Sequence, residues 1–225
     1  MIYPFLIWAL ILIGIWIILY ILRKDLRKEM IISSLVALPF GLTEKLFVPN
    51  YWNPQTLFNL AARIGFDIES FLYAFAIGGV AAVLYEVLFS KKHNRSRRDF
   101  SIIRLIIALF IIFIVSLIYI KLNISPHLMH LSLLIMATWV VIFLVVEPRT
   151  LKERLIGGLF FAIIHFVIIL LLEITNPGFI SSTWITNDLW GVYILKAPIE
   201  EIFWAFLFGA IWAPIYEDIK GYKLK

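Results

Sequence analysis

Residues 66–88 read FDIESFLYAFAIGGVAAVLYEVL, and residues 197–219 read APIEEIFWAFLFGAIWAPIYEDI. The two segments align without a gap. Eight of the 23 aligned positions are identical: Ile68/Ile199, Glu69/Glu200, Ala74/Ala205, Phe75/Phe206, Gly78/Gly209, Ala82/Ala213, Tyr85/Tyr216 and Glu86/Glu217. Each segment is apolar and long enough to cross a bilayer, with a carboxylate near its start and Tyr-Glu at its end. We interpret the pair as a duplicated membrane unit that carries acidic groups at fixed depths.

The composition excludes a sizeable soluble domain, because 62% of the 225 residues are hydrophobic and only 16% are charged. The absence of cysteine excludes a disulfide framework, a thiol nucleophile and a Cys-ligated metal centre. The sequence contains neither GxGxxG nor a P-loop motif, so we predict no cofactor and no metal ion. The net charge of +5 comes from short basic loops, which indicate membrane orientation rather than binding to nucleic acid.

The hydrophobic runs predict an all-α bundle of seven transmembrane helices, each close to the ~20 residues that a bilayer requires. The predicted spans are 3–22, 30–46, 67–89, 101–121, 128–147, 154–174 and 192–217. Pro39 and Gly41 interrupt the second run. Fifteen of the 20 basic residues fall in the loops 23–28, 91–98 and 149–154 and in the tail 220–225. The positive-inside rule therefore predicts a multi-pass protein of the cell membrane, with the N-terminus outside and the C-terminus in the cytoplasm.

The repeat extends beyond its best-matching helix, because residues 26–31 resemble residues 151–156. We therefore divide the single membrane domain, 1–225, into repeat one (1–90), a linker helix (101–121) and repeat two (128–219). Three helices and the single linker helix cross the membrane four times, so the second unit starts on the same side as the first. The two three-helix units are therefore predicted to be parallel repeats about an axis along the membrane normal.

Six acidic residues are predicted near the outer ends of four helices: Glu44, Asp67, Glu69, Glu173, Glu200 and Glu201. The repeat symmetry predicts that these helix ends meet around one cavity. Poorly solvated carboxylates that repel one another cannot all stay ionised, so at least one proton would be available for donation. The alternative is structural, because a carboxylate in the first turn of a helix interacts favourably with the macrodipole.

Lys196, Arg63 and His165 each have a functional and a structural interpretation. Lys196 and Arg63 can keep one carboxylate ionised beside a protonated neighbour, or can snorkel to the interface. His165 lies mid-span and can relay protons, line the pocket or make an interhelical hydrogen bond. Glu86 and Glu217 lie about 26 Å further along their helices. We expect them to pair with inner-loop Lys or Arg, with Tyr85 and Tyr216 as interfacial anchors.

Aromatic side chains follow both acidic motifs directly. They are Phe71, Tyr73 and Phe75 in the first copy, and Phe203, Trp204 and Phe206 in the second. Rings beside acids suit a carbocation reaction, because the π face of a ring stabilises positive charge. The structural alternative is helix packing and interfacial anchoring.

Residues 198–203 (PIEEIF), the weaker copy at residues 67–71 (DIESF) and the closing Tyr-Glu pairs resemble a known family. It is the lycopene cyclase domain of the small heterodimeric bacterial cyclases and their fused archaeal and fungal counterparts. The resemblance covers most of the chain as two units. The first copy lacks the proline and the second glutamate. The family's Trp-Asp pair on the preceding helix is not evident, and Glu44 and Glu173 stand near the place of its acid.

The resemblance implies redox-neutral cyclisation of the end group of a linear carotenoid. It implies catalytic roles for Glu200 and Glu201, supported by Glu69, Glu44 and Glu173, with Phe71, Tyr73, Phe203, Trp204 and His165 against the substrate. The expected partners are an isoprenoid substrate and membrane lipid, and the sequence leaves a homo-oligomer open. A second hypothesis is a non-catalytic carrier of an isoprenoid or retinoid, in which the acids only stabilise the bundle. A third is an enzyme of this fold that acts on another polyprenyl lipid.

Overall fold

The computed structural model describes residues 3–89, 93–94, 102–125, 127–220 and 223–224, and within these the chain is almost entirely helical. The first unit contains α1 (Pro4–Leu22), α2 (Arg27–Ala37), the 3-10 helix η1 (Leu38–Thr43), α3 (Glu44–Phe47), α4 (Ala61–Ile64) and α5 (Ile68–Phe89). After the two-residue strand β1 (His93–Asn94) come α6 (Ile102–Lys121) and α7 (Leu128–Val146). The rest contains η2 (Pro148–Thr150), α8 (Leu151–Thr175), α9 (Phe179–Thr183), η3 (Thr186–Asp188), β2 (Tyr193–Ile194), β3 (Ala197–Pro198), α10 (Ile199–Trp212), α11 (Ile215–Lys220) and β4 (Lys223–Leu224).

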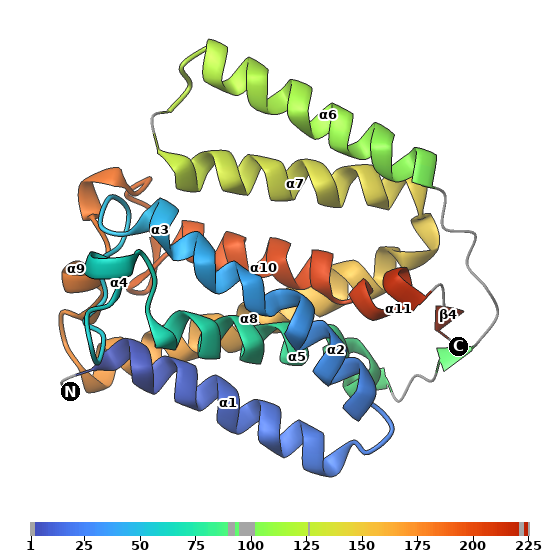
Figure 1. Cartoon of the computed structure of the whole chain (residues 1–225), viewed down its shortest axis with the longest axis horizontal. Helices are drawn as coiled ribbons and strands as arrows, with labels where there is room; N and C mark the ends of the chain where they lie inside the picture. Colours follow the sequence, from blue (N-terminus) through green and yellow to red (C-terminus); the bar gives the residue numbers. More distant parts are fainter. Residues whose placement is uncertain (1–2, 90–92, 95–101, 126, 221–222, 225) are drawn as a thin grey trace.

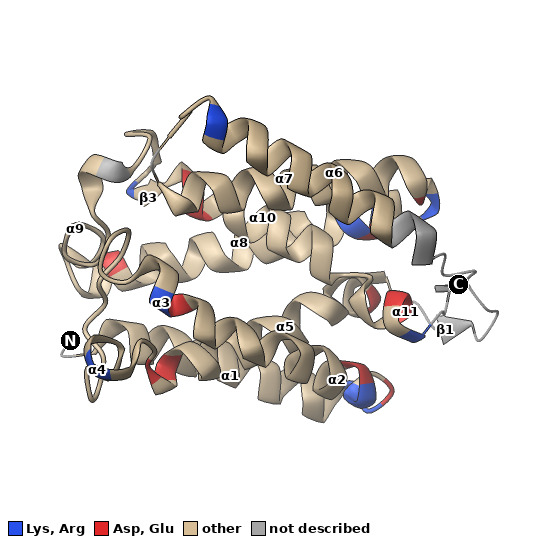
Figure 2. Cartoon of the chain, turned by 45° about the horizontal axis from the view of Figure 1, so that its top comes forward, with Lys and Arg blue, Asp and Glu red and all other residues tan. Residues whose placement is uncertain are grey.

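Six helical stretches in the described residues are long and apolar enough to cross a membrane: Pro4–Leu22, Arg27–Phe47, Ile68–Phe89, Leu128–Val146, Pro148–Thr175 and Ile199–Lys220. In α6, the part Ile106–Lys121 is apolar but shorter, so the predicted count of seven spans stays a prediction. Charged residues lie mainly toward the two ends of the long helices (Figure 2). This distribution is compatible with a multi-pass membrane protein.

Two predicted spans differ from the observed helices for local chemical reasons. The second span is continuous from α2 to α3 but tightens into η1 around Pro39, whose ring removes one backbone donor. The seventh span was predicted to begin at residue 192, whereas α10 begins at Ile199. The residues before α10 form a small antiparallel hairpin instead, which pairs Tyr193 with Pro198 and Ile194 with Ala197.

Two helix pairs pack closely through small residues. Gly78 of α5 lies against α2, where an added Cβ would overlap the Ala37 Cβ. Gly209 of α10 lies against α8, where an added Cβ would come within 2.8 Å of the Phe161 Cβ. Both glycines therefore permit a helix approach that any larger residue prevents. These two contacts make Ala37 and Phe161 equivalent positions in the two helix pairs. This equivalence differs by one residue from the alignment of residues 26–31 with residues 151–156.

The helices form layers around a core between α5, α8 and α10, while α6 lies outside α7 at one edge of the molecule (Figure 1). The α6 helix exposes many large apolar side chains, among them Phe110 and Phe113. Such a surface suits contact with lipid. The described part of α1 begins at one end of the bundle, and α11 ends at the other.

Candidate active site

An apolar cavity of about 430 Å³ lies between α1, η1, α3, α5, α7 and α10. Two carboxyl groups line it, Glu44 from α3 and Glu201 from α10. The other lining residues are Phe5, Trp8, Phe40, Thr43, Leu46, Phe47, Tyr51, Trp52, Ser70, Tyr73, Ala74, Ile77, Met129, Ser132, Ile135, Met136, Trp184, Trp204, Phe208, Ile211 and Trp212. A mostly apolar pocket with a few convergent polar groups is the usual form of a small-molecule site.

Glu201 lies at the centre of a buried polar network. Its Oε1 accepts hydrogen bonds from the Tyr51 hydroxyl and the Trp184 indole N–H, both at 2.9 Å. Its Oε2 lies 3.7 Å from Nε2 of His165. Burial, followed by the nearby Glu201 charge, raises the pKa of Tyr51 well above its ordinary value. Tyr51 therefore stays a hydrogen-bond donor to Glu201 at any physiological pH.

His165 connects this network to the aromatic wall of the cavity. Its Nδ1 lies 3.4 Å from the Tyr73 hydroxyl, and its ring contacts Trp8 and Trp204 at centroid distances of 4.9 and 5.5 Å. The His165 side chain is buried and lies behind the lining rather than in it. This position suits holding Glu201 and Tyr73 in place.

Glu44, which belongs to the first unit, lines the cavity. Its Oε2 accepts a hydrogen bond of 2.5 Å from the backbone N–H of Asp67, while its buried Oε1 accepts no hydrogen bond from the described residues. Asp67 in turn accepts hydrogen bonds from the backbone N–H groups of Leu60 and Ala61. The loop between α3 and α5 thus fixes one oxygen of Glu44.

Glu69 and Glu200, the identical acids of the repeat, both bond to loops rather than line the cavity. Glu69 accepts a hydrogen bond of 2.6 Å from the Leu57 N–H, and Glu200 accepts one from the Trp190 N–H. Both carboxylates are buried at the start of their helices. Each therefore anchors the loop that precedes its helix.

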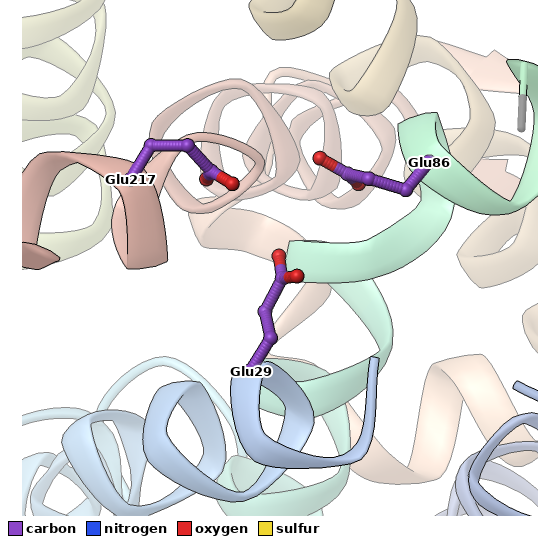
Figure 3. Close-up of side chains that lie close together, drawn as sticks. All are labelled: Glu29, Glu86 and Glu217. Carbon is purple, nitrogen blue, oxygen red and sulfur yellow. The ribbon is translucent and has the colours of Figure 1, made fainter. Parts of the chain in front are cut away.

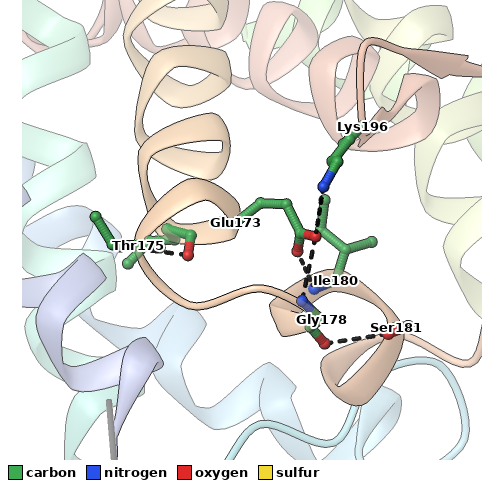
Figure 4. Close-up of polar contacts among 7 residues, drawn as sticks. Glu173, Thr175, Gly178, Ile180, Ser181 and Lys196 are labelled. Atoms are coloured by element: carbon green, nitrogen blue, oxygen red, sulfur yellow. Dashed lines mark hydrogen bonds and ion pairs between the residues drawn. The ribbon is translucent and has the colours of Figure 1, made fainter.

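Glu173 also anchors a loop, at the end of α8 (Figure 4). It accepts hydrogen bonds from the backbone N–H groups of Gly178 and Ile180 at 3.2 and 3.0 Å, and pairs with Lys196 at 3.4 Å. The Lys196 side chain is largely exposed, so this ion pair contributes little. Arg63 of α4 is exposed and, within the described part of the chain, pairs with no carboxylate.

The aromatic residues expected to contact substrate fall into two groups. Tyr73 and Trp204 line the cavity. Phe71 packs against Phe66 and Gly41, and Phe203 is 39% exposed on the outside of α10; neither lines the cavity. The face of α10 that meets the cavity carries Trp204, Phe208 and Trp212, whose successive rings stack at centroid distances of 5.4 and 5.0 Å.

Several lining residues were not identified from the sequence. Phe208 and Trp212 follow the predicted residue Trp204 at a spacing of four residues, which places the three side chains on one helix face and could have been recognised. Tyr51 and Trp184 come from irregular segments that meet at a backbone hydrogen bond from Ile185 N to the Tyr51 carbonyl. Such loop contacts leave no periodic signal in the sequence.

Comparison with known proteins gives one result. Residues 127–219 match the family model described as Lycopene cyclase, a segment that contains His165, Glu173, Glu200 and Glu201. Searches of curated proteins and of solved structures give no match. The resemblance to the lycopene cyclase domain family that the sequence indicated is therefore confirmed over residues 127–219.

Proposed function

We propose that the protein cyclises the end group of a linear carotenoid such as lycopene by acid–base chemistry, with no change of redox state. The family match suggests a cyclase-type function on a hydrophobic isoprenoid. The observation that carries the proposal is the cavity, in which two carboxyl groups, Glu44 and Glu201, are set in a wall of aromatic rings. The two acids come from different halves of the chain, so the site would require both halves.

In the proposed reaction, the carboxylic acid of Glu44 donates a proton to the terminal double bond of the substrate. Oε1 of Glu44, which has no hydrogen-bond donor among the described residues, is the atom proposed to carry this proton. A C–H bond forms, and the neighbouring carbon becomes a tertiary cation. A second double bond of the substrate attacks that cation, which closes the ring and moves the positive charge onto a ring carbon.

Glu201 is proposed to be the base that completes the reaction. The Tyr51 and Trp184 donors stabilise its carboxylate form. That carboxylate removes a proton from the carbon beside the cation, and the C–H electrons form the new ring double bond. The product is an isomer of the substrate, and return of the proton from Glu201 to Glu44 completes the cycle. The rings of Trp204 and Phe208 can stabilise the intermediate cation through their π faces.

The cavity also offers a route from the bilayer. Phe40 and Leu46 line the cavity and are 48% and 52% exposed. The cavity therefore reaches the exposed surface of η1 and α3. We propose that the end group of the substrate enters between α3 and α7, while the rest of the polyene stays in lipid. Excluding water from the cavity would protect the cation from hydration.

We also propose that α6 crosses the membrane as a seventh span, with the N-terminus outside and the C-terminus in the cytoplasm. The basic loops at residues 23–28 and 149–154 support this orientation; much of the loop at 91–98 lies outside the described residues. Reporter fusions in the 91–98 loop and after Lys225 should both report a cytoplasmic location, and opposite locations would refute the parallel-repeat arrangement.

The deciding experiment is expression in a lycopene-accumulating host, with pigments analysed by chromatography. The wild type should produce cyclised carotenoid. Glu201→Gln, which keeps the size of the side chain but cannot accept the proton, should lower the yield per folded protein by roughly 10²–10⁴-fold. Glu217→Gln, at the other end of the bundle, is the control and should act only on stability. Wild-type yield from Glu201→Gln would refute the assignment.

The second candidate function is a non-catalytic isoprenoid or retinoid carrier. It is favoured by the loop-anchoring bonds of Glu69, Glu173 and Glu200, which use these carboxylates structurally. A purified wild type that binds lycopene or retinal without converting it would support the carrier and exclude the cyclase.

A further inference from the structure

Three glutamates from both halves of the chain converge at the opposite end of the bundle from the cavity. They are Glu29 of α2, Glu86 of α5 and Glu217 of α11 (Figure 3). One carboxylate oxygen from each lies within 4.8 Å of the others, and the exposed fractions of the three residues are 1%, 0% and 0%. Glu86 and Glu217 are the closing acids of the repeated motif.

Two arginines near this cluster also bond to other groups. Arg23, expected to pair with such an acid, bonds through its Nη1 to the main-chain carbonyl of Glu86, and its side chain pairs with Asp25. Arg154 bonds to Asp218 and to the Ala210 carbonyl. A fourth glutamate, Glu153 of α8, is also buried and lies close enough to Glu86 for their charges to interact.

Glu86 gives an independent indication that this cluster binds a ligand. Its side chain is fully buried, and neither carboxylate oxygen accepts a hydrogen bond from the described residues. Figure 3 shows this carboxylate directed toward Glu29 and Glu217. A buried carboxylate without hydrogen-bond donors is strongly unfavourable unless a proton or a cation compensates it.

We propose that Glu29, Glu86 and Glu217 bind a hard divalent cation such as Ca²⁺. Carboxylate oxygens are the ligands that such cations prefer, and two oxygens on opposite sides of a Ca²⁺ ion lie about 4.8 Å apart. The observed spacing therefore places all three oxygens within reach of one ion. Because Glu29 and Glu86 belong to the first half and Glu217 to the second, the ion would join the two halves at this end.

Thermal unfolding of the purified full chain in a non-ionic detergent tests the proposal. After treatment with a chelator, the protein is titrated separately with Ca²⁺, Mg²⁺ and Na⁺. Ca²⁺ at about 100 times its dissociation constant should raise the unfolding midpoint of the wild type by roughly 5–10 °C. Glu86→Gln should lose most of this shift.

Asp25→Asn is the matched control, because it removes one exposed carboxylate near the same end of the bundle. This variant should keep the full response to Ca²⁺. Equal shifts in the wild type and in Glu86→Gln would overturn the proposal, as would no shift in the wild type, since protons would then compensate the three acids.

Equilibrium dialysis with Mn²⁺ provides a second measurement, which remains decisive if Glu86→Gln fails to fold. The wild type should bind one ion per chain, and Glu217→Gln should bind at least about 10-fold more weakly. Absence of Mn²⁺ binding by the wild type would overturn the proposal. Neither measurement uses carotenoid conversion, so its outcome is independent of the proposed cyclase activity.

Discussion

The two ends of the bundle use buried carboxylates in opposite ways. At the end that holds the cavity, Glu69, Glu173, Glu200 and Glu201 all accept hydrogen bonds from backbone N–H groups or from aromatic side chains. At the other end, Glu29, Glu86 and Glu217 face one another, and Glu86 has no hydrogen-bond donor among the described residues. The same residue type thus has different chemistry at the two ends of the bundle.

The loops at the end that holds the cavity account for this difference. The segments before α5 and α10 are irregular, so they bring free backbone N–H groups to the helix starts. Glu86 lies inside α5, where the N–H groups already bond to the carbonyls of the helix. Its carboxylate must therefore find another side chain, a proton or an ion.

The largest effect is expected for an acid at the end of the bundle that holds the cavity. Glu44→Gln removes the second cavity acid and should lower carotenoid cyclisation per folded protein by roughly 10²–10⁴-fold. Glu173→Gln removes an acid that only anchors a loop and should lower stability while leaving that specific yield nearly unchanged. The measurement is pigment yield in a lycopene-accumulating host, normalised to folded protein; equal losses in both variants would contradict the division into cavity and loop acids.

A large effect on stability is expected at the inner end. Arg154 is fully buried and bonds to Thr150, Ala210 and Asp218. Arg154→Met should destabilise the protein by about 3–5 kcal/mol, because it removes the fully buried member of the ion pair with Asp218. The unfolding midpoint in detergent should then fall on the order of 10 °C.

Asp25→Asn removes a partly exposed ion pair at the same end and should cost about 0–1 kcal/mol. If the two variants were equally stable, the inner end would not depend on buried ionic contacts.

A moderate effect is expected between the two ends, where glycines bring the helices together. Gly78→Ala should destabilise the protein by about 1–3 kcal/mol, because the new methyl group overlaps the Ala37 Cβ. Gly14→Ala of α1 has no neighbour within 4 Å at the added Cβ and should be neutral or slightly stabilising. Thermal unfolding of both variants measures the difference, and an unaffected Gly78→Ala would show that the α2–α5 packing can relax.

The smallest effect concerns a single donor to Glu201. Tyr51→Phe removes one of the two hydrogen bonds to Oε1 and should lower cyclisation by about 10-fold, equivalent to ~1.4 kcal/mol. The raised pKa of Tyr51 means that its folded form keeps the proton while an unfolded chain ionises near pH 10. Its contribution to stability is therefore complete below pH 10 and decreases above it.

Absorbance near 295 nm reports tyrosinate and tests this pKa. The folded wild type and Tyr51→Phe should give the same titration up to about pH 10. An additional tyrosinate in the folded wild type below that pH would contradict the buried position of Tyr51.

Much of the fold was predictable from the order of residues alone. Apolar runs of bilayer length, separated by polar loops, are sufficient to predict a helical membrane protein, because every backbone group in lipid must bond within its own segment. The repeated Glu positions in residues 66–88 and 197–219 predicted acids at equivalent depths. The lycopene cyclase resemblance, inferred from PIEEIF and the closing Tyr-Glu, is confirmed for residues 127–219.

The roles of individual acids depended on tertiary structure. Glu200 and Glu201 are adjacent in the chain, yet successive positions on a helix point about 100° apart. Glu201 therefore reaches the cavity, whereas Glu200 reaches the backbone of Trp190. The convergence of Glu29, Glu86 and Glu217 likewise combines three helices from two halves of the chain. The spacing of residues within one helix indicates their depth in the membrane and the helix face on which they lie. Only the packing between helices determines which side chains meet.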